Sequence, residues 1–185
     1  MLFRSVPVRL EREGPRVVFG WMTQPVPTVS PFDRATELLA ALGVARSELP
    51  VEVYDNGIAH VYVSLPSRDA VAAVRPDMAR LAALGVTGSN VFAGDGERWK
   101  TRMFAPASGV PEDPATGSAA GPLALHLARH GRIAFGTTIR IEQGTEMKRP
   151  SELHVRVRGD AGAPIIEVGG AAVVVGRGEF RLERG

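Results

Sequence analysis

The sequence lacks cysteine entirely, and this absence excludes disulfide scaffolds, thiolate catalysis and zinc sites built on cysteine. No apolar run approaches the roughly 20 residues that a membrane-spanning helix requires, and no secretory leader is evident. Lysine and arginine form no stripe or cluster, although nucleic-acid binding needs such a footprint. We therefore predict a soluble, cytoplasmic protein with no membrane or nucleic-acid partner.

The composition that remains is typical of a globular protein. Of the 185 residues, 44% are hydrophobic and 23% are charged, so disordered, collagen-like and coiled-coil classes are disfavoured. A chain of this length corresponds to one ordinary domain or to one and a half small ones. The 21 glycines and 14 prolines predict many turns between short elements.

Apolar patterns predict strands and helices mixed without regular alternation, which favours an α+β fold. Strands are expected at Val6–Glu11, Arg16–Thr23, Val51–Tyr54, Ala59–Leu65, Asn90–Ala93, Trp99–Phe104, Thr138–Gln143, Glu152–Arg158, Pro164–Val168, Ala171–Val175 and Glu179–Leu182. Helices are expected at Phe32–Leu42, Ser67–Val74, Pro76–Leu84 and about Thr116–His130. Gln24–Pro31 is predicted to be an extended linker, and Ala105–Ala115 a proline-rich loop.

One segment carries most of the chemistry. It reads MFAPASGVPEDPATGSAAG from Met103 to Gly121, and a helix is expected to begin near Thr116. The first amides of a helix have no intrahelical partner, and the helix dipole makes them a site for a carboxylate or another anion. Small residues from Gly117 onward allow close approach, while Pro122, expected in the first turn, needs no donor there. The pattern predicts an anion cradle with the Asp113 carboxylate beside it.

A plain structural interpretation of the same segment stays open. Thr116 or Ser118 could be only a helix N-cap, and Asp113 only a turn residue. Two other motifs are excluded. A phosphate-binding P-loop requires a lysine that does not follow Gly117 or Gly121, and a nucleophile elbow requires Gly-x-Ser-x-Gly where this chain has Gly-Ser-Ala-Ala-Gly.

The sequence resembles the PhzF family over nearly its whole length. The stretch EDPATGSAAGPLALHLARHG is similar to the signature of that family, and IEQGTEMKRPS at Ile141–Ser151 is similar to its EQG…GRPS element. Shorter matches are RMFAP at Arg102–Pro106 and MTQP at Met22–Pro25. Agreement at this many ordered positions is implausible by chance.

The resemblance implies a diaminopimelate epimerase-like fold, in which two similar domains each wrap strands around a central helix and the active site lies between them. It also implies a cofactor-independent isomerase that moves a proton on a small carboxylate metabolite. On that pattern Asp113 is the catalytic-site residue that orients the amino or hydroxyl group of the substrate. The amides of Gly117 and Ser118 hold its carboxylate, assisted by the hydroxyls of Thr116 and Ser118. No metal or organic cofactor is expected.

The chain departs from the family pattern in two places. Full-length relatives carry their main proton-shuttling glutamate, and a supporting histidine, in an N-terminal domain that precedes anything resembling Val6. We therefore expect an N-terminal truncation, with residues 1–23 as remnant strands of that domain, 24–170 as the C-terminal domain and 171–185 as a returning strand. Lys148 stands where the family commonly has glycine.

This expectation gives two functional hypotheses. One is an isomerase to which this chain contributes the C-terminal half of the active site; the other is a catalytically inert fragment that only binds an anion or ligand. The unpaired strand edge of a truncated domain would expose apolar surface, so we predict self-association or poor expression of the isolated chain. A homodimer is compatible with the resemblance.

The remaining histidines suggest simpler roles. His126 and His130 are four residues apart on the predicted helix and could hold zinc, but no third ligand with suitable spacing is evident, so no metal site is predicted. His60 is expected to be an exposed residue at a strand end, although it could line the cleft. Gln143, at the start of a loop, could also reach the cleft. Trp21 and Trp99 are expected in packed positions.

Overall fold

The computed structural model of the chain describes residues 6–171, 173–176, 178 and 179. Within them lie four α-helices: α1 (Ala35–Leu42), α2 (Arg68–Ala73), α3 (Met78–Ala83) and α4 (Gly117–Arg129). The strands are β1 (Val8–Glu13), β2 (Arg16–Gln24), β3 (Thr28–Pro31), β4 (Glu52–Asp55), β5 (Ala59–Ser64), β6 (Gly88–Asp95), β7 (Arg98–Ala105), β8 (Val110–Asp113), β9 (Thr138–Gln143), β10 (Ser151–Arg158) and β11 (Ile165–Ala171). Two short 3₁₀ turns, η1 (Pro106–Ser108) and η2 (Thr145–Met147), complete the description.

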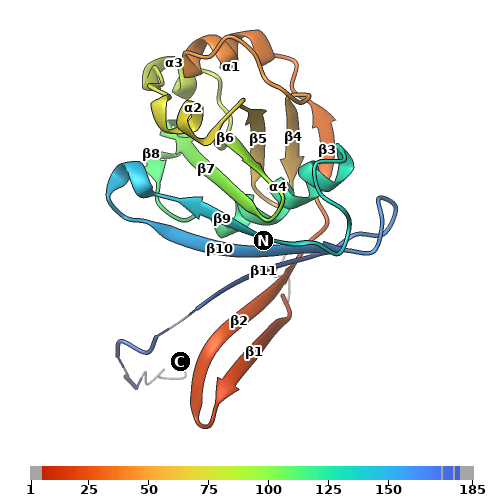
Figure 1. Ribbon diagram of the computed structural model, residues 1–185. Helices are drawn as coiled ribbons and strands as arrows, with labels where there is room; N and C mark the ends of the chain where they lie inside the picture. Colours follow the sequence, from red (N-terminus) through yellow and green to blue (C-terminus); the bar gives the residue numbers. More distant parts are fainter. Residues whose placement is uncertain (1–5, 172, 177, 180–185) are drawn as a thin grey trace, which may run out of the picture.

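All eleven strands belong to one sheet. Ten follow the order β1-β2-β11-β10-β9-β7-β6-β5-β4-β3, and β8 pairs with β7 outside this path. The β5–β6 and β7–β9 pairs are parallel, and the others are antiparallel. The sheet curls around α4 while α1, α2 and α3 lie at the opposite side of β4–β7 (Figure 1). This arrangement confirms the α+β class and the expected central helix.

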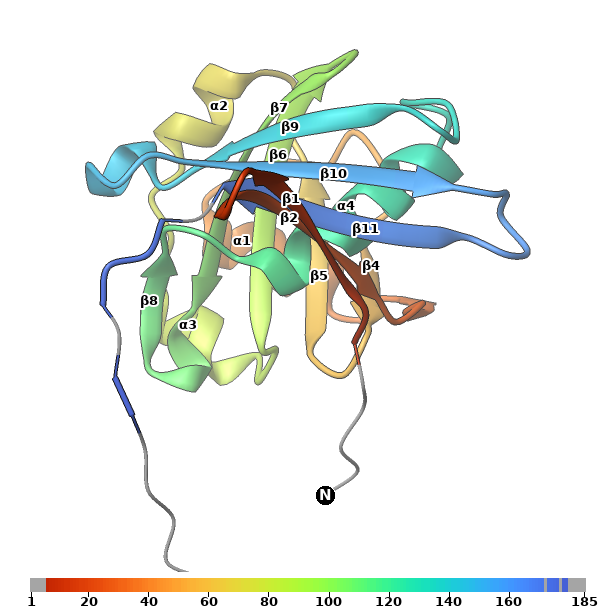
Figure 2. The ribbon, with the colours of Figure 1, turned by 90° about the horizontal axis from the view of Figure 1, so that it is seen from below.

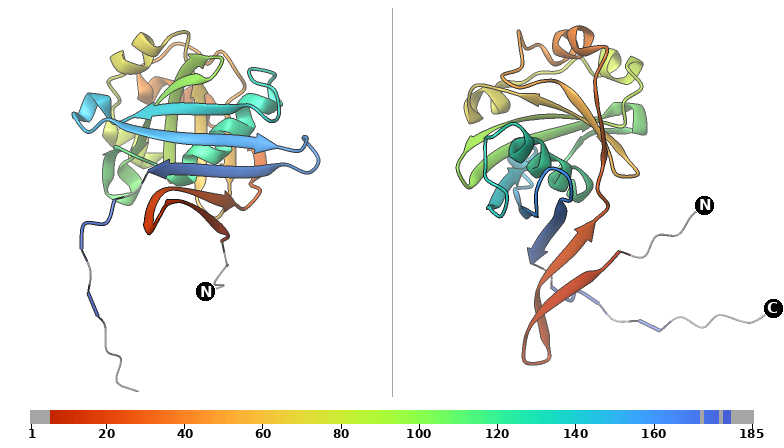
Figure 3. Two further views of the ribbon diagram at one scale, coloured as in Figure 1. Left: turned by 60° about the horizontal axis from the view of Figure 1, so that its bottom comes forward. Right: turned by 90° about the vertical axis from the view of Figure 1, so that its right-hand side faces the viewer.

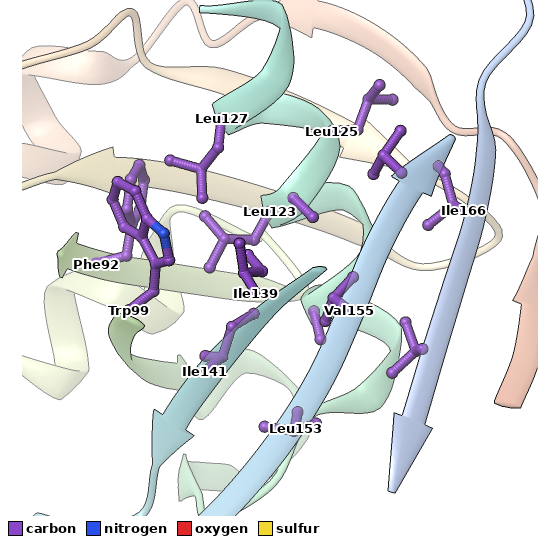
Figure 4. Packing of buried hydrophobic residues seen from close by; sticks show 14 of the residues in the cluster. Phe92, Trp99, Leu123, Leu125, Leu127, Ile139, Ile141, Leu153, Val155 and Ile166 are labelled. Atoms are coloured by element: carbon purple, nitrogen blue, oxygen red, sulfur yellow. The ribbon is translucent and has the colours of Figure 1, made fainter. Parts of the chain in front are cut away.

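The two faces of the curled sheet carry separate hydrophobic cores. On the inner face, leucines of α4 pack against β9, β10 and β11 (Figure 4). On the outer face, α1, α2 and α3 cover a second cluster that includes Val61, Val63 and Val91. Strand alternation sends Val61 and Val63 to one core and Tyr62 to the other, because successive side chains point to opposite faces. Helix α4 is therefore buried nearly all round, as an apolar helix must be.

The β1–β2 hairpin extends away from this body (Figure 3), and β2 joins it by pairing with β11, which Figure 2 shows beside it from below. All six residues of β1 are exposed, and β1 is the first strand in the order, so it forms an edge. Val8 and Leu10 are 56% and 48% exposed, and Val173 to Val175 are still more open. An apolar edge of this kind is the feature on which predicted self-association depends. Self-association and the three-part domain division stay predictions.

Most predicted elements are confirmed, with small shifts at their ends. Helices α1 and α3 end before Gly43 and Gly85, whose positive φ angles of 71° and 68° suit glycine. Gly131, with φ of 67°, follows α4 in the same way. The hairpin turn falls at Gly14–Pro15 as expected.

Four expectations need correction. The supposed linker Gln24–Pro31 contains β3, and the supposed loop Ala105–Ala115 contains β8, because both segments are extended and find a neighbouring strand edge. The predicted strands Pro164–Val168 and Ala171–Val175 are instead one strand, β11, and residues 173–176 lie outside any strand. Glu179 also lies outside a strand, and the rest of the predicted strand Glu179–Leu182 falls outside the described residues.

Candidate active site

The start of α4 leaves two backbone donors open. The amides of Ala119 and Ala120 both donate to the Thr116 carbonyl oxygen at 3.1 Å. Those of Gly117 and Ser118 have no acceptor among the described residues. A side chain added at Gly117 would meet nothing within 4 Å, so space adjoins these amides. Two unpaired donors at the positive end of a helix dipole therefore lie where the sequence predicts an anion cradle.

Asp113 lies beside this cradle because it is the last residue of β8. Its backbone pairs with Met103 of β7, which fixes where the strand ends. The hydroxyl of Thr116 donates to Asp113 Oδ2 at 2.6 Å. Thr116 occupies the N-cap position, yet its side chain makes no capping bond to the helix. Thr116 is therefore the N-cap residue by position alone, because its hydroxyl binds the Asp113 carboxylate and not a helix amide.

Gln143, at the end of β9, links the two sides of the site. Its amide nitrogen donates to the Asp113 carbonyl oxygen at 2.7 Å and to Thr116 Oγ1 at 2.9 Å. Its amide oxygen accepts from the Thr116 backbone N–H at 3.2 Å. The side chain is 1% exposed, so these bonds form in a dry environment where they are strong. Gln143 therefore joins the site as a fixed support.

The next residue, Gly144, brings the β9 loop against the Asp113 loop. Its φ angle is 79°, and a side chain there would lie 2.3 Å from the Arg149 carbonyl oxygen and 2.7 Å from that of Pro114. Glycine is the residue that tolerates both the left-handed backbone and this close approach.

A buried ion pair holds β8 from the other side. Arg102, on β7, binds both carboxylate oxygens of Glu112 at 2.8 and 2.9 Å. The same guanidinium donates to the Val74 carbonyl oxygen at the end of α2, at 2.8 Å. A planar, bidentate guanidinium contact fixes orientation as well as distance. The Glu112–Asp113 pair is thus placed by both the sheet and the covering helices.

Side chains from other strands support the first turns of α4. Pro122 lies in the second turn, not in the first as expected, and it has no N–H for the Ser118 carbonyl oxygen. The Asn56 side chain donates to that oxygen at 3.1 Å, which replaces the missing helical bond. Gln24 likewise donates to the Gly117 carbonyl oxygen at 2.8 Å.

His60 contradicts its expected exposure. It is 2% exposed, and its Nε2 lies 3.1 Å from Ser118 Oγ. Burial lowers the pKa of His60 to about 4, so the ring is neutral near pH 7. The Asn90 amide nitrogen lies 3.5 Å from Nδ1 and also donates to the Val61 carbonyl oxygen. This contact assigns the ring proton to Nε2, which then donates to the Ser118 hydroxyl.

The structure therefore brings together all four residues predicted for the site: Asp113, Thr116, Gly117 and Ser118. The sequence left open that His60 could line the cleft, and it gave no indication that Asn56 contacts Ser118. One signal was present: strand alternation places His60 on the same face as Tyr62, whose hydroxyl donates to the Ala119 carbonyl oxygen at 2.8 Å. The sequence could not show which face of β5 meets α4, because residues on both faces are buried.

A second polar cluster lies at the other end of α4. The sequence suggested no third ligand for His126 and His130, and this expectation is wrong, because Glu52 of β4 lies against both rings. The two histidines are well separated along the helix from the cradle at Gly117.

The fold and the open helix start together define a class: proteins with a diaminopimelate epimerase-like fold. Among solved structures, a predicted epimerase from Pseudomonas aeruginosa matches with a TM-score of 0.73 and 27% identity, over 97% of this chain and 64% of that one. A PhzF-family phenazine biosynthesis protein from Bacillus anthracis also gives a TM-score of 0.73, at 20% identity over 89% of this chain and 61% of that one. The second likeness concerns the fold alone.

The sequence comparisons identify the family within this class. The PhzC-PhzF family, described as phenazine biosynthesis-like proteins, matches residues 5–178, and the chain belongs to that family. It is 50% identical over 179 residues to a trans-2,3-dihydro-3-hydroxyanthranilate isomerase from Pseudomonas chlororaphis. The matched region covers 96% of this chain and 64% of that relative. The corresponding isomerase from Pseudomonas aeruginosa is 49% identical, with the same coverage. The chain thus spans a little under two thirds of these relatives.

None of the helices in the described part of the chain has both the length and the apolar character needed to cross a membrane.

Proposed function

We propose that this chain forms the anion-binding half of an isomerase active site, which acts on a small carboxylate by cofactor-independent proton transfer. The observation that carries the proposal is the pair of open amides at Gly117 and Ser118 beside the Asp113 carboxylate. A donor pair and a carboxylate side by side suit a ligand that has a carboxylate and a neighbouring amino or hydroxyl group. Trans-2,3-dihydro-3-hydroxyanthranilate, named for relatives about half identical to this chain, has this chemistry.

Each residue then has a defined role in holding the substrate. The two amides bind the substrate carboxylate, and Asp113 accepts from its amino or hydroxyl group. Thr116 donates to Oδ2 of Asp113, which leaves Oδ1 without a partner among the described residues and able to accept from the ligand. Gln143 keeps this geometry fixed before the ligand arrives. Such preorganisation reduces the entropy lost on binding.

His60 acts in this proposal through Ser118. Its Nε2–H donates to the Ser118 oxygen, so the hydroxyl proton of Ser118 is directed elsewhere and can point at the bound carboxylate. A neutral imidazole in a buried position performs this task over the physiological pH range, because its pKa lies near 4.

The alternative function is ligand binding without turnover. It is favoured by the hydrogen bonds of the two titratable side chains beside the cradle. Asp113 accepts from Thr116, and His60 donates to Ser118. Proton transfer needs a general acid or base with a pKa near the working pH. The family resemblance assigns that role to a glutamate of a preceding domain, so we propose that this chain alone binds ligand and that turnover requires that domain.

A matched pair of substitutions tests the cradle. Gly117→Pro removes one donor at the first helical position, where proline is tolerated, and Gly117→Ala keeps the donor. We expect Gly117→Pro to weaken calorimetric binding of 3-hydroxyanthranilate about tenfold, and Gly117→Ala to leave it nearly unchanged. Asp113→Asn should weaken it similarly, whereas the exposed Asp33→Asn should not. Equal affinities for all four variants and the wild type would overturn the proposal.

Turnover is measured separately. Trans-2,3-dihydro-3-hydroxyanthranilate is incubated in deuterated water with this chain, alone and mixed with the N-terminal domain of a relative, and the product is analysed by mass spectrometry. Deuterium incorporation that requires the added domain supports the shared active site. Incorporation by the chain alone contradicts the division of roles, and binding without incorporation in either mixture selects the binding-only alternative.

A further inference from the structure

Three potential metal-ligand atoms converge at the C-terminal half of α4. The carboxylate oxygen Oε2 of Glu52, on β4, lies 3.1 Å from His126 Nδ1 and 2.9 Å from His130 Nε2. All three atoms lie within 4.8 Å of one another. The two histidines are four residues apart, so they occupy one helix face, and β4 brings the carboxylate to that face.

Neighbouring groups orient this cluster without closing it. The Tyr54 hydroxyl donates to Glu52 Oε2 at 2.9 Å, and Arg129 Nη2 lies 3.8 Å from the other oxygen, Oε1. His126 is fully buried, whereas the side chains of His130 and Glu52 are 21% and 14% exposed. Solvent therefore reaches the cluster from the His130 side. In many metal sites, hydrogen bonds from neighbouring groups hold the metal-binding side chains in place.

We propose that Glu52, His126 and His130 bind a divalent transition-metal ion of the zinc class, with water as the fourth ligand. Two imidazole nitrogens and one carboxylate form a ligand set typical of Zn²⁺ and Co²⁺, whereas Mg²⁺ and Ca²⁺ prefer oxygen alone. Ligand bonds to zinc are about 2.0–2.2 Å long, so an ion between these atoms requires only small side-chain movements. The positive charge of Arg129 opposes the ion and makes the site weaker than one without it.

The environment of Nε2, the second ring nitrogen of His126, is compatible with metal coordination through Nδ1. Nε2 is buried and has no hydrogen-bond partner among the described residues. The Tyr62 ring stacks on the imidazole with the centroids 5.8 Å apart, and the Phe92 ring is nearly perpendicular to it at 5.6 Å. When Nδ1 binds a metal, the ring proton is on Nε2, where an aromatic ring can accept it weakly. When Nδ1 carries the proton, the lone pair of Nε2 is buried without a donor among the described residues.

The ion would serve stability rather than isomerisation. His126 follows Gly117 by nine positions on α4, which places it about 13 Å along the helix from the cradle. An ion held by one strand residue and two helix residues ties β4 to α4. Binding to the folded state alone raises the melting temperature by mass action. This inference is therefore independent of the proposed isomerase function.

The test uses the tag-free full chain after treatment with a chelator. We titrate Co²⁺ and record visible absorption, because four-coordinate cobalt gives an intense, characteristic band, and then displace it with Zn²⁺. We expect one Co²⁺ per chain, displaced by Zn²⁺ but not by Mg²⁺. Zn²⁺ at 100-fold excess over its Kd should raise the melting temperature by about 5 °C or more.

Three variants assign the signal. His130→Gln removes the most accessible ligand and should weaken Co²⁺ binding at least about tenfold. Tyr54→Phe keeps the ligands but removes an orienting bond, and a loss of about tenfold is expected there too. The control is His154→Gln, because His154 also pairs with a glutamate, Glu152, at 2.9 Å, but on the surface and without a second imidazole.

The outcomes are distinct. A cobalt band lost in His130→Gln and kept in His154→Gln supports the site, and if His130→Gln does not fold, the Tyr54→Phe titration decides. No band and no Zn²⁺-dependent rise in melting temperature in the wild type would overturn the proposal and leave a purely hydrogen-bonded cluster. A band that persists in His130→Gln and disappears in His154→Gln would overturn it as well.

Discussion

The two ends of α4 differ in how their polar groups are paired. At the start, Gly117 and Ser118 have small or no side chains, and their amides have no acceptor among the described residues. At the far end, His126 and His130 fill the space with rings that contact Glu52. The helix is buried along its length, so its polar groups need partners at both ends. The comparison shows that side chains occupy the far end, whereas two backbone donors at the start have no partner among the described residues.

The largest expected effect at the open end is that of Gly144→Ala. The added methyl group would meet two backbone oxygens and force a left-handed φ angle of 79° on alanine, so the Pro114 loop must move. We expect a loss of more than about 3 kcal/mol in the free energy of unfolding, measured in urea, together with loss of ligand binding. Gly117→Ala, which meets open space, should change stability by less than about 0.5 kcal/mol.

The next effect is the pH dependence that His60 contributes. Its folded pKa of about 4 lies below the ordinary value of 6.5, so between these values the unfolded chain binds a proton that the folded chain does not. Stability from this source is complete above pH 6.5 and falls as the pH decreases toward 4, by a total on the order of 3 kcal/mol.

Urea unfolding at a series of pH values measures this fall. In His60→Gln the decrease between pH 6.5 and 4 should be shallower, whereas His154→Gln should match the wild type. An unchanged slope in His60→Gln would show that His60 is accessible to protons in the folded state.

A smaller effect concerns the Ser118 carbonyl oxygen. Asn56→Ala leaves that oxygen without a partner because Pro122 has no N–H, and we expect a loss of about 1–2 kcal/mol. In a Pro122→Ala background the helix supplies its own donor, so the cost of Asn56→Ala should fall to below about 1 kcal/mol. The two substitutions are combined in a double-mutant cycle, measured by urea unfolding. If Asn56→Ala costs the same free energy of unfolding in the wild type and in Pro122→Ala, the Asn56 bond does not compensate for the N–H that Pro122 lacks.

The smallest effect is expected at Lys148, where the family resemblance implies glycine. Its φ angle of 59° is the one positive value at a non-glycine residue in the described part of the chain. Lys148→Gly relieves this strain but gives the unfolded chain more freedom, so a net gain of about 0.5 kcal/mol is expected. Lys148→Ala, which keeps the strain, should bring no gain. Thermal unfolding of the two variants makes the comparison.

The sequence predicted the open end of α4 well because its signals are local. Glycine after a helix, small residues at a helix start and a short run of ordered motif residues can all be read without knowing the fold. The pairing of β8 with β7 could not be read, since Pro111 and Pro114 suggest a loop and only a neighbouring edge makes the segment a strand.

The polar partners at both ends were missed for a different reason. Glu52, Asn56 and His60 lie more than 50 positions before the helix residues that they contact. Their contacts depend on how the sheet curls around α4, which periodicity does not specify. Residues on both faces of β5 are buried, so even the inward direction of His60 required the structure.

The central claim is that the first amides of α4 bind a small carboxylate. The most direct measurement is a titration of the ¹⁵N-labelled chain with 3-hydroxyanthranilate, followed by amide chemical shifts. We predict that the Gly117 and Ser118 amides shift most, in a saturable manner, while the amides around His126 and His130 stay constant. A saturable ligand response that leaves both amides unchanged, or no response at millimolar ligand, would contradict the account.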